Sequence, residues 1–216
     1  MVQVRKVYSD GRHNAFTSLV RWRGYLYVAF RSGTRHVWPG RPDGQIRVLR
    51  SSDCGQSWKQ VALLALPDLD MRDPKLLATE DRLFVHSFGY QDQNRRDAFV
   101  CYSDDGVAFS PFRRAVTEDN VVIWWPVEHA GHLYGTGYRY HGNKKDIRSV
   151  FLQSEDGLCW RVSSVVYDVP WANETALAMA PDGQATALVR NDGQRLEPPA
   201  SNGRPVLVTS TPPYTE

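Results

Sequence analysis

Short segments in which apolar and polar residues alternate run along the whole chain. Clear examples are residues 45–50, 97–102 and 148–153. This alternation has the two-residue period of a β-strand with one buried face. No segment has the period of about 3.6 residues typical of an amphipathic helix. The longest apolar run, residues 61–66, is six residues, whereas a membrane-spanning helix needs about 20. The pattern predicts an all-β chain without a membrane partner.

One turn sequence occurs three times. Residues 51–58 read SSDCGQSW, and residues 103–109 (SDDGVAF) and 154–160 (SEDGLCW) repeat the pattern in a form one residue shorter. The first serines of the three segments are 52 and 51 residues apart. An aspartate at this position accepts hydrogen bonds from nearby backbone N–H groups, and the glycine takes a positive φ. The near-constant spacing indicates a repeated structural unit.

A second series of turns lies between the first. Its centres are Gly24, Asp81, Gly131 and Gly183, which are 57, 50 and 52 residues apart. Each centre separates two strand-like segments, so each unit holds two hairpins, or four antiparallel strands. A unit of about 40–50 residues with four strands is the blade of a β-propeller. We therefore predict one domain, residues 1–216, with blades near residues 12–60, 72–112, 121–165 and 172–216.

Charge is unevenly distributed, although the net charge is only +2. Residues 1–50 contain ten Lys and Arg but only Asp10 and Asp43 as acidic residues. This excess fits either a pocket for an anion or a solvated basic surface. The pI of 8.4 is below the value of about 9 that is typical of nucleic-acid-binding domains, so no nucleic-acid partner is expected.

The cysteines and the N-terminal residues bear on cofactors and on cellular location. The three cysteines form no Cys-x-x-Cys or Cys/His pattern, so we expect no metal site and no cofactor. Their odd number and the lack of an apolar signal core in the first residues favour a cytoplasmic protein. A secreted or periplasmic location stays open if a signal has been removed.

The three Ser-x-Asp turns resemble the Asp-box (BNR) repeats of sialidases (neuraminidases) and related six-bladed β-propellers. The resemblance covers nearly the whole chain, through about four blades of an incomplete six-bladed propeller. It implies a sialidase-like glycoside hydrolase of the exo type, whose substrate is an acidic glycan held by arginines. The alternatives are a non-catalytic glycan-binding propeller and a protein-interaction propeller. Four blades of a larger ring would also expose backbone groups, so self-association through open blade edges is expected.

The best match to the sialidases is Asn173-Glu174 followed by Arg190-Asn191. The resemblance implies that Glu174 is the catalytic carboxylate that polarises a tyrosine nucleophile, and that Arg190 is one of three arginines that bind the substrate carboxylate. Glu174 precedes Gly183 by nine residues and Arg190 follows it by seven, so the two should face each other at one end of a hairpin. A purely structural ion pair is the alternative.

Other positions depart from the family pattern. Its first-blade arginine falls on Ala15, and Arg31 and Arg72 are the available replacements. Asp43 is the nearest match to the catalytic acid. The alternatives are that Asp43 is only a turn aspartate, and that His36 serves as the acid instead, although a lone histidine is more often structural. The remaining residues predicted to bind substrate near the propeller axis are Asp73, Tyr138, His13 and Asn14.

Overall fold

Each predicted turn joins two antiparallel strands in the computed structural model. The structure describes residues 4–36, 40, 42–92, 95–141 and 146–215. The first sheet consists of β1 (His13–Trp22), β2 (Tyr25–Gly33), β3 (Gln45–Ser51) and β4 (Lys59–Leu64), in that order. The second consists of β5 (Asp70–Ala78), β6 (Leu83–Asp92), β7 (Arg95–Ser103) and β8 (Arg113–Arg114).

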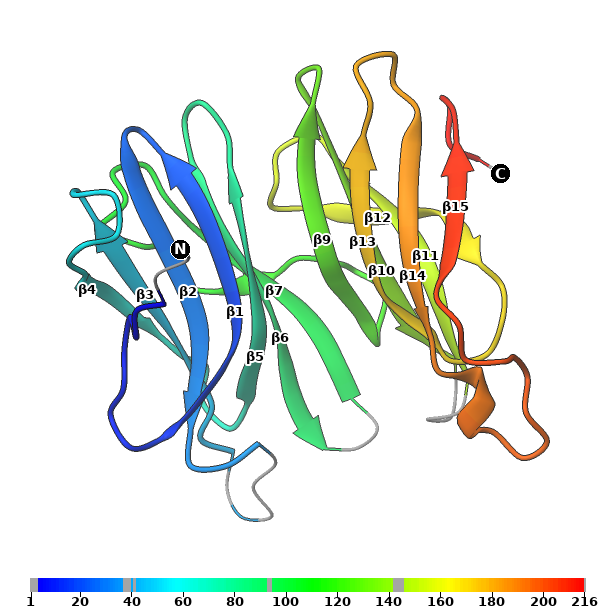
Figure 1. The fold of residues 1–216 in the computed structure, drawn as a ribbon, viewed down its shortest axis with the longest axis horizontal. Helices are drawn as coiled ribbons and strands as arrows, with labels where there is room; N and C mark the ends of the chain where they lie inside the picture. Colours follow the sequence, from blue (N-terminus) through cyan, green and yellow to red (C-terminus); the bar gives the residue numbers. More distant parts are fainter. Residues whose placement is uncertain (1–3, 37–39, 41, 93–94, 142–145, 216) are drawn as a thin grey trace.

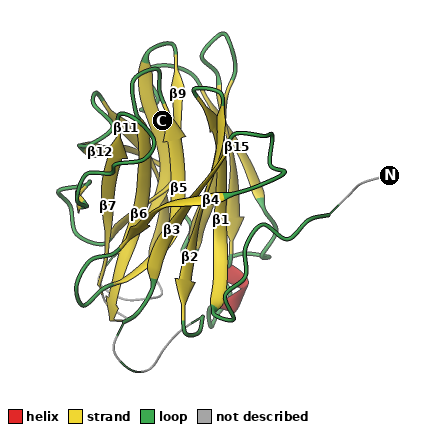
Figure 2. Ribbon diagram, turned by 90° about the vertical axis from the view of Figure 1, so that its left-hand side faces the viewer, coloured by secondary structure: helices red, strands yellow, loops and turns green. Residues whose placement is uncertain are grey.

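The second half of the chain continues this plan, except that its last sheet has three strands among the described residues instead of the predicted four. The third sheet consists of β9 (Val121–His129), β10 (His132–Tyr140), β11 (Ile147–Ser154) and β12 (Trp160–Tyr167). The fourth consists of β13 (Ala172–Met179), β14 (Ala185–Asn191) and β15 (Val206–Ser210). The turn η1 (Gly193–Arg195) is the one helical element in the described residues (Figure 2), and none of these forms a helix long or apolar enough to cross a membrane.

The four sheets follow one another side by side in chain order (Figure 1). Their first strands contact one another in sequence: β1 contacts β5, β5 contacts β9, and β9 contacts β13. The later strands of each sheet extend away from these inner strands. This confirms the predicted all-β propeller of four blades, and it brings the first strand of every blade close to one axis.

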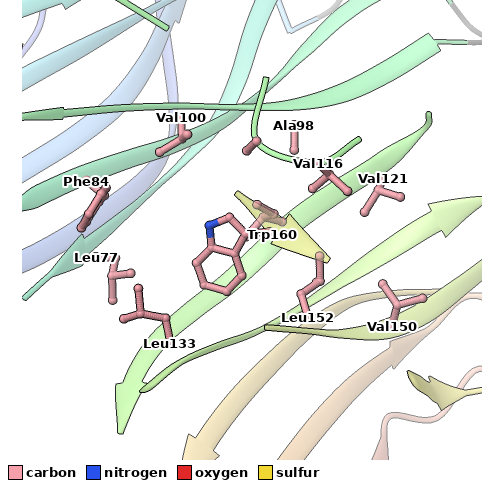
Figure 3. Packing of buried hydrophobic residues seen from close by; sticks show 12 residues of the cluster. Leu77, Phe84, Ala98, Val100, Val116, Val121, Leu133, Val150, Leu152 and Trp160 are labelled. Carbon is pink, nitrogen blue, oxygen red and sulfur yellow. The ribbon is translucent and has the colours of Figure 1, made fainter. Parts of the chain in front are cut away.

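Apolar side chains fill the space between neighbouring blades. Trp160, at the start of β12, is 3% exposed. It lies among Phe84 and Val100 of the second blade and Leu133 and Leu152 of the third (Figure 3). Its indole Nε1 donates a hydrogen bond to the Gly157 carbonyl at 3.0 Å. The aromatic residue that ends a Ser-x-Asp turn therefore helps to join two blades.

In all three Ser-x-Asp turns the serine Oγ accepts from the glycine N–H, and the aspartate accepts from backbone N–H groups, from that of Ser57 in the longer first turn and from those of two residues in the shorter ones. Asp156 Oδ1 accepts from the backbone N–H groups of Leu158 and Cys159, both at 2.8 Å. Asp105 Oδ1 accepts in the same way from the two residues at equivalent positions. Each turn joins the third and fourth strands of its blade, on the outside of the propeller. These turns therefore support the scaffold, away from the axis.

We expect Gly157→Ala to lower the free energy of unfolding by about 1–3 kcal/mol more than Gly131→Ala does. Both glycines have a positive φ, +74° and +77°, so the backbone strain is matched. A Cβ on Gly157 would lie 2.7 Å from the Phe84 ring of the preceding blade, whereas a Cβ on Gly131 would meet nothing within 4 Å. Urea denaturation of both variants measures the difference. Equal losses would contradict this packing between blades.

The fourth blade exposes apolar side chains on a face. Leu188 of β14 pairs with Leu207 of β15, and they are 51% and 65% exposed. Self-association stays a prediction. Because these leucines are exposed, we expect it to involve this face of the fourth blade as well as the open strand edges.

Candidate functional site

Residues from all four blades line a cleft of about 580 Å³, here called the central cleft. The blades contribute Phe16, Arg72, Asp73, Tyr138, Glu174 and Arg190, among others. Phe16, Arg72 and Glu174 lie on the first strands of their blades, and Tyr138 and Arg190 on the second strands. Because these strands meet near the axis, residues far apart in sequence share one site.

Glu174 and Arg190 form an ion pair in this cleft. Ala172 pairs with Asn191 and Thr175 with Val189, and an irregularity between these pairs places Glu174 opposite Arg190. Arg190 Nη1 lies 2.8 Å from Glu174 Oε2, and its Nη2 lies 2.9 Å from Asp192 Oδ2. The predicted contact is confirmed. Both side chains are partly exposed to the cleft, at 36% for Glu174 and 44% for Arg190.

Arg72 is held beside the same cleft. Its Nη1 donates to the His36 carbonyl at 3.0 Å and contacts Asp70 Oδ2 at 3.4 Å. Its guanidinium carbon lies 5.1 Å from the centroid of the Phe16 ring, within the range of a cation–π contact. The sequence therefore placed Arg72 and Arg190 correctly in one cavity, although their contact with a ligand is still a prediction.

Asp73 has an unusual environment in the central cleft. Its carboxyl is buried, and burial raises the pKa of Asp73 to about 6, against the opposing effect of Lys75 and Arg72. Burial lowers the pKa of Lys75, whose Nζ lies 3.9 Å from the centroid of the Trp124 ring. From the sequence, Asp73 was expected only to bind substrate. In the structure, Asp73 is a cleft carboxyl group that stays protonated in mildly acidic solution.

Arg31 is not placed to hold a ligand. It is fully buried, and its Nε and Nη2 donate to the two carboxylate oxygens of Asp70 at 2.7 and 2.9 Å. Its Nη1 donates to the Arg35 carbonyl at 3.0 Å. Arg31 does not line the central cleft. The structure therefore replaces its predicted ligand-binding role by a structural ion pair between the first two blades.

Asp43 also lies outside the central cleft. Its Oδ2 accepts from the Thr34 N–H and from Arg12 Nη2, both at 2.9 Å. Burial raises the pKa of Asp43, but the hydrogen bonds from Thr34 outweigh that effect and leave the pKa below its usual value. A carboxyl that loses its proton more readily than usual is a poor proton donor. These contacts favour the alternative of a turn aspartate, and the catalytic role of Asp43 stays a prediction that its place outside the central cleft does not support.

The other predicted residues divide between the cleft and its surroundings. Tyr138 and His36 line the central cleft. His13 is not among the lining residues, and its Nδ1 lies 3.4 Å from Arg31 Nη1. Asn14 is not among them either, and its Nδ2 donates to Asp10 Oδ1 at 2.8 Å. The structure therefore places His13 and Asn14 outside the lining of the central cleft, and their predicted contact with substrate stays a prediction.

Arg96 is a cleft residue that the sequence analysis missed. Its guanidinium carbon lies 4.4 Å from the ring centroid of Tyr140 and 5.0 Å from that of Tyr90, and all three residues line the cleft. Arg96 lies on the third strand of its blade, whereas the positions predicted to face the axis lie on the first two strands. The one feature of the sequence that could have pointed to this part of the cleft is the presence of tyrosines at positions 90, 138 and 140.

Positive charge exceeds negative charge among the described residues that line the cleft. Arg72, Lys75, Arg96 and Arg190 are basic, whereas Asp73 and Glu174 are acidic. Protonation of Asp73 increases this excess of positive charge. The cleft therefore favours an anionic ligand, with planar guanidinium groups that match a carboxylate. Nowhere in the described part of the chain do three or more His, Cys, Asp or Glu residues lie where they could hold a metal ion.

Comparison with known proteins reveals similarity in fold. A structure of a protein of unknown function from Dyadobacter fermentans matches with a TM-score of 0.77 and 17% identity, over 96% of this chain and 68% of that one. A Hadza microbial sialidase matches with a TM-score of 0.75 and 14% identity, over 94% and 45% of the two chains. Trypanosoma rangeli sialidase in complex with the inhibitor DANA matches with a TM-score of 0.73 and 11% identity, over 93% and 37%. The chain thus spans less than half the length of these two sialidases. No protein-family model and no curated protein matches its sequence.

Proposed function

We propose that this chain is a sialidase-like glycoside hydrolase that binds an acidic glycan in the central cleft. The observation that carries the proposal is a pair of carboxyl groups in different environments, Asp73 buried and Glu174 paired with Arg190, in a cleft with an excess of basic groups. Such a pair supplies the acid and the carboxylate that glycoside hydrolysis requires. The likeness in fold to two sialidases supports this reaction class.

The arginines hold the acidic sugar. Arg72 and Arg190 each present a guanidinium to the cleft, and a guanidinium binds a carboxylate through two parallel hydrogen bonds. Arg96, which also lines the cleft, takes the place of Arg31 as the third arginine that binds the ligand carboxylate. Arg190 has five N–H donors in the plane of its guanidinium. Glu174 contacts Nη1 and Asp192 contacts Nη2, so further N–H groups are left for the ligand carboxylate.

Asp73 and Glu174 carry the proposed chemistry. The Asp73 carboxyl gives its proton to the glycosidic oxygen as the bond from that oxygen to the anomeric carbon breaks. Positive charge develops on the sugar ring, and the Glu174 carboxylate stabilises it. A water molecule then adds to the anomeric carbon and gives its proton to a cleft carboxylate. Asp73 thus replaces Asp43 as the proposed acid.

One observation favours a second function, glycan binding without hydrolysis. Burial raises the pKa of Tyr138 and of Tyr140, and both line the cleft. A tyrosine nucleophile needs its phenolate form, which a raised pKa disfavours. Neither residue therefore fits the nucleophile that the family resemblance implies.

Hydrolysis of a fluorogenic sialoside tests the first function, and titration with N-acetylneuraminic acid tests the second. Turnover that is lost in Asp73→Asn and retained in Asp104→Asn supports the hydrolase; Asp104 is an exposed residue paired with Arg82 on the outside. Binding without turnover supports the second function. Neither binding nor turnover would leave the acidic-sugar proposal without support.

We expect Arg190→Lys to weaken binding of N-acetylneuraminic acid by about 1–3 kcal/mol, because lysine keeps the charge but loses the two parallel hydrogen bonds. Arg161→Lys is the matched control, since Arg161 contacts Gln153 on the outer strands of the third blade. Calorimetric titration gives both affinities. A purely structural ion pair predicts instead a loss of stability in Arg190→Lys with unchanged affinity.

A further inference from the structure

The central cleft continues into a second cavity of about 410 Å³, here called the side lobe. The two cavities share five lining residues: Arg96, Tyr138, Tyr140, Glu174 and Arg190. Each cavity falls within the range of about 300–1,000 Å³ that is usual for small-molecule sites. The Glu174–Arg190 ion pair therefore stands at the junction of two spaces, each large enough for a ligand group.

The side lobe combines flat apolar surfaces with fixed polar groups. Trp171 and Ile147 supply apolar surface that is not part of the central cleft, and Asn173 and Asp192 supply polar atoms. Asp192 is held in place, because Asn173 Nδ2 donates to its Oδ2 at 3.3 Å and Arg190 contacts the same oxygen. A sugar ring has an apolar C–H face and a hydroxyl edge, and this lining offers a partner for each.

Two features of Trp171 are energetically unfavourable. Its φ is +69°, a region that bulky residues rarely adopt. Its buried indole Nε1 has no hydrogen-bond partner among the described residues. The backbone is nevertheless fixed, because its N–H donates to the Ile147 carbonyl at 2.9 Å and its carbonyl accepts from the Asp192 N–H at 3.0 Å. Strain that the surrounding structure enforces is typical of residues placed for function.

We propose that the side lobe is a second sugar subsite, in which the residue next to the terminal acidic sugar stacks on Trp171. The site then takes a glycan of at least two residues, with the acidic sugar in the central cleft. The glycosidic bond between them lies at the junction, beside Glu174 and Arg190. This inference rests on the proposed function, because it assigns the acidic sugar to the central cleft.

Binding to Asp73→Asn protein, in which the ligand is not hydrolysed, tests the inference. The ligands are N-acetylneuraminic acid, which fills one cavity, and sialyllactose, which extends beyond it. We expect sialyllactose to bind at least about tenfold more tightly, and Trp171→Gly to remove that advantage while affinity for the monosaccharide stays within about twofold. Trp171→Phe keeps an aromatic face and should keep most of the advantage.

The glycine variant also removes the strain at φ +69°, so its backbone is compatible with the fold. Trp171→Asn, which tolerates the same region, replaces it if the glycine variant does not fold. Equal affinity for both ligands would overturn the second subsite and leave the proposed function intact. An equal loss for both ligands in Trp171→Gly would also overturn it, since Trp171 would then shape the central cleft. If neither ligand binds the Asp73→Asn protein or the native chain, both proposals fail.

Discussion

Replacing Asp73 by asparagine is expected to lower turnover at least about 100-fold, the usual contribution of a general acid. Asparagine is nearly the same size and cannot donate the proton to the glycosidic oxygen. The backbone should tolerate the change, because Asp73 has a φ of +47° and asparagine is one of the residues that adopt this region. Loss of activity should therefore occur in a folded protein.

The same substitution is expected to stabilise the protein at neutral pH. The pKa of Asp73 is raised from 3.8 to about 6 in the fold, so between these values the folded state binds more protons than the unfolded state. The free energy of unfolding then falls as pH rises through this window. By about pH 8 the buried charge lowers stability by up to about 3 kcal/mol. Asparagine carries no charge and avoids this penalty.

Urea denaturation at about pH 4 and about pH 8 measures this effect. Asp73→Asn should gain stability over the native chain at the higher pH and little at the lower pH, whereas Asp104→Asn should show no such difference. Turnover of the native chain should also decline above about pH 6, as Asp73 loses its proton. Full activity in Asp73→Asn, or a lower stability at pH 8, would show that Asp73 is not a buried acid.

Replacing Arg31 by methionine is expected to lower the free energy of unfolding by about 3–5 kcal/mol, because it leaves the buried Asp70 carboxylate without its main partner. Arg31 is fully buried and makes two short contacts with Asp70, whose remaining arginine contact is to Arg72 at 3.4 Å. Affinity for N-acetylneuraminic acid should change little, since Arg31 does not line the cleft.

Denaturation and calorimetric titration of Arg31→Met and of the exposed control Arg161→Met separate the two roles. The double variant Arg31→Met/Asp70→Leu should recover part of the lost stability, since it removes both buried charges. A loss of affinity of about tenfold or more with unchanged stability would instead restore Arg31 to the ligand-binding role that the sequence suggested.

The sequence could predict the contact between Glu174 and Arg190 because both lie in one hairpin. The distance along a strand is about 3.3 Å per residue, so counting from the turn at Gly183 sets which residues meet. The turns at Asp53, Asp105 and Asp156 were predictable for the same reason, since their hydrogen bonds join residues within four positions of one another. In the fourth blade, Ser210 pairs with Ala185 as Ser51 pairs with Leu26, although the sequence after Ser210 lacks the Asp-Gly pattern.

The choice among candidate arginines and carboxyls could not be made in this way. Arg31 and Asp70 are 39 residues apart and belong to different blades, so no local count shows that they neutralise each other. Arg96 reaches the cleft from a third strand, a position that depends on how neighbouring blades pack.

Local periodicity and turn chemistry, which act over a few residues, determined that this chain forms strands, hairpins and repeated blades. The tertiary structure alone decided which charged groups are buried against each other and which face the cleft. Asp73 shows the physical reason, because its pKa depends on burial and on Lys75, Arg72 and the distant Glu174. Solvation and charge interactions of this kind depend on distances in space, which the packing of one blade against the next sets.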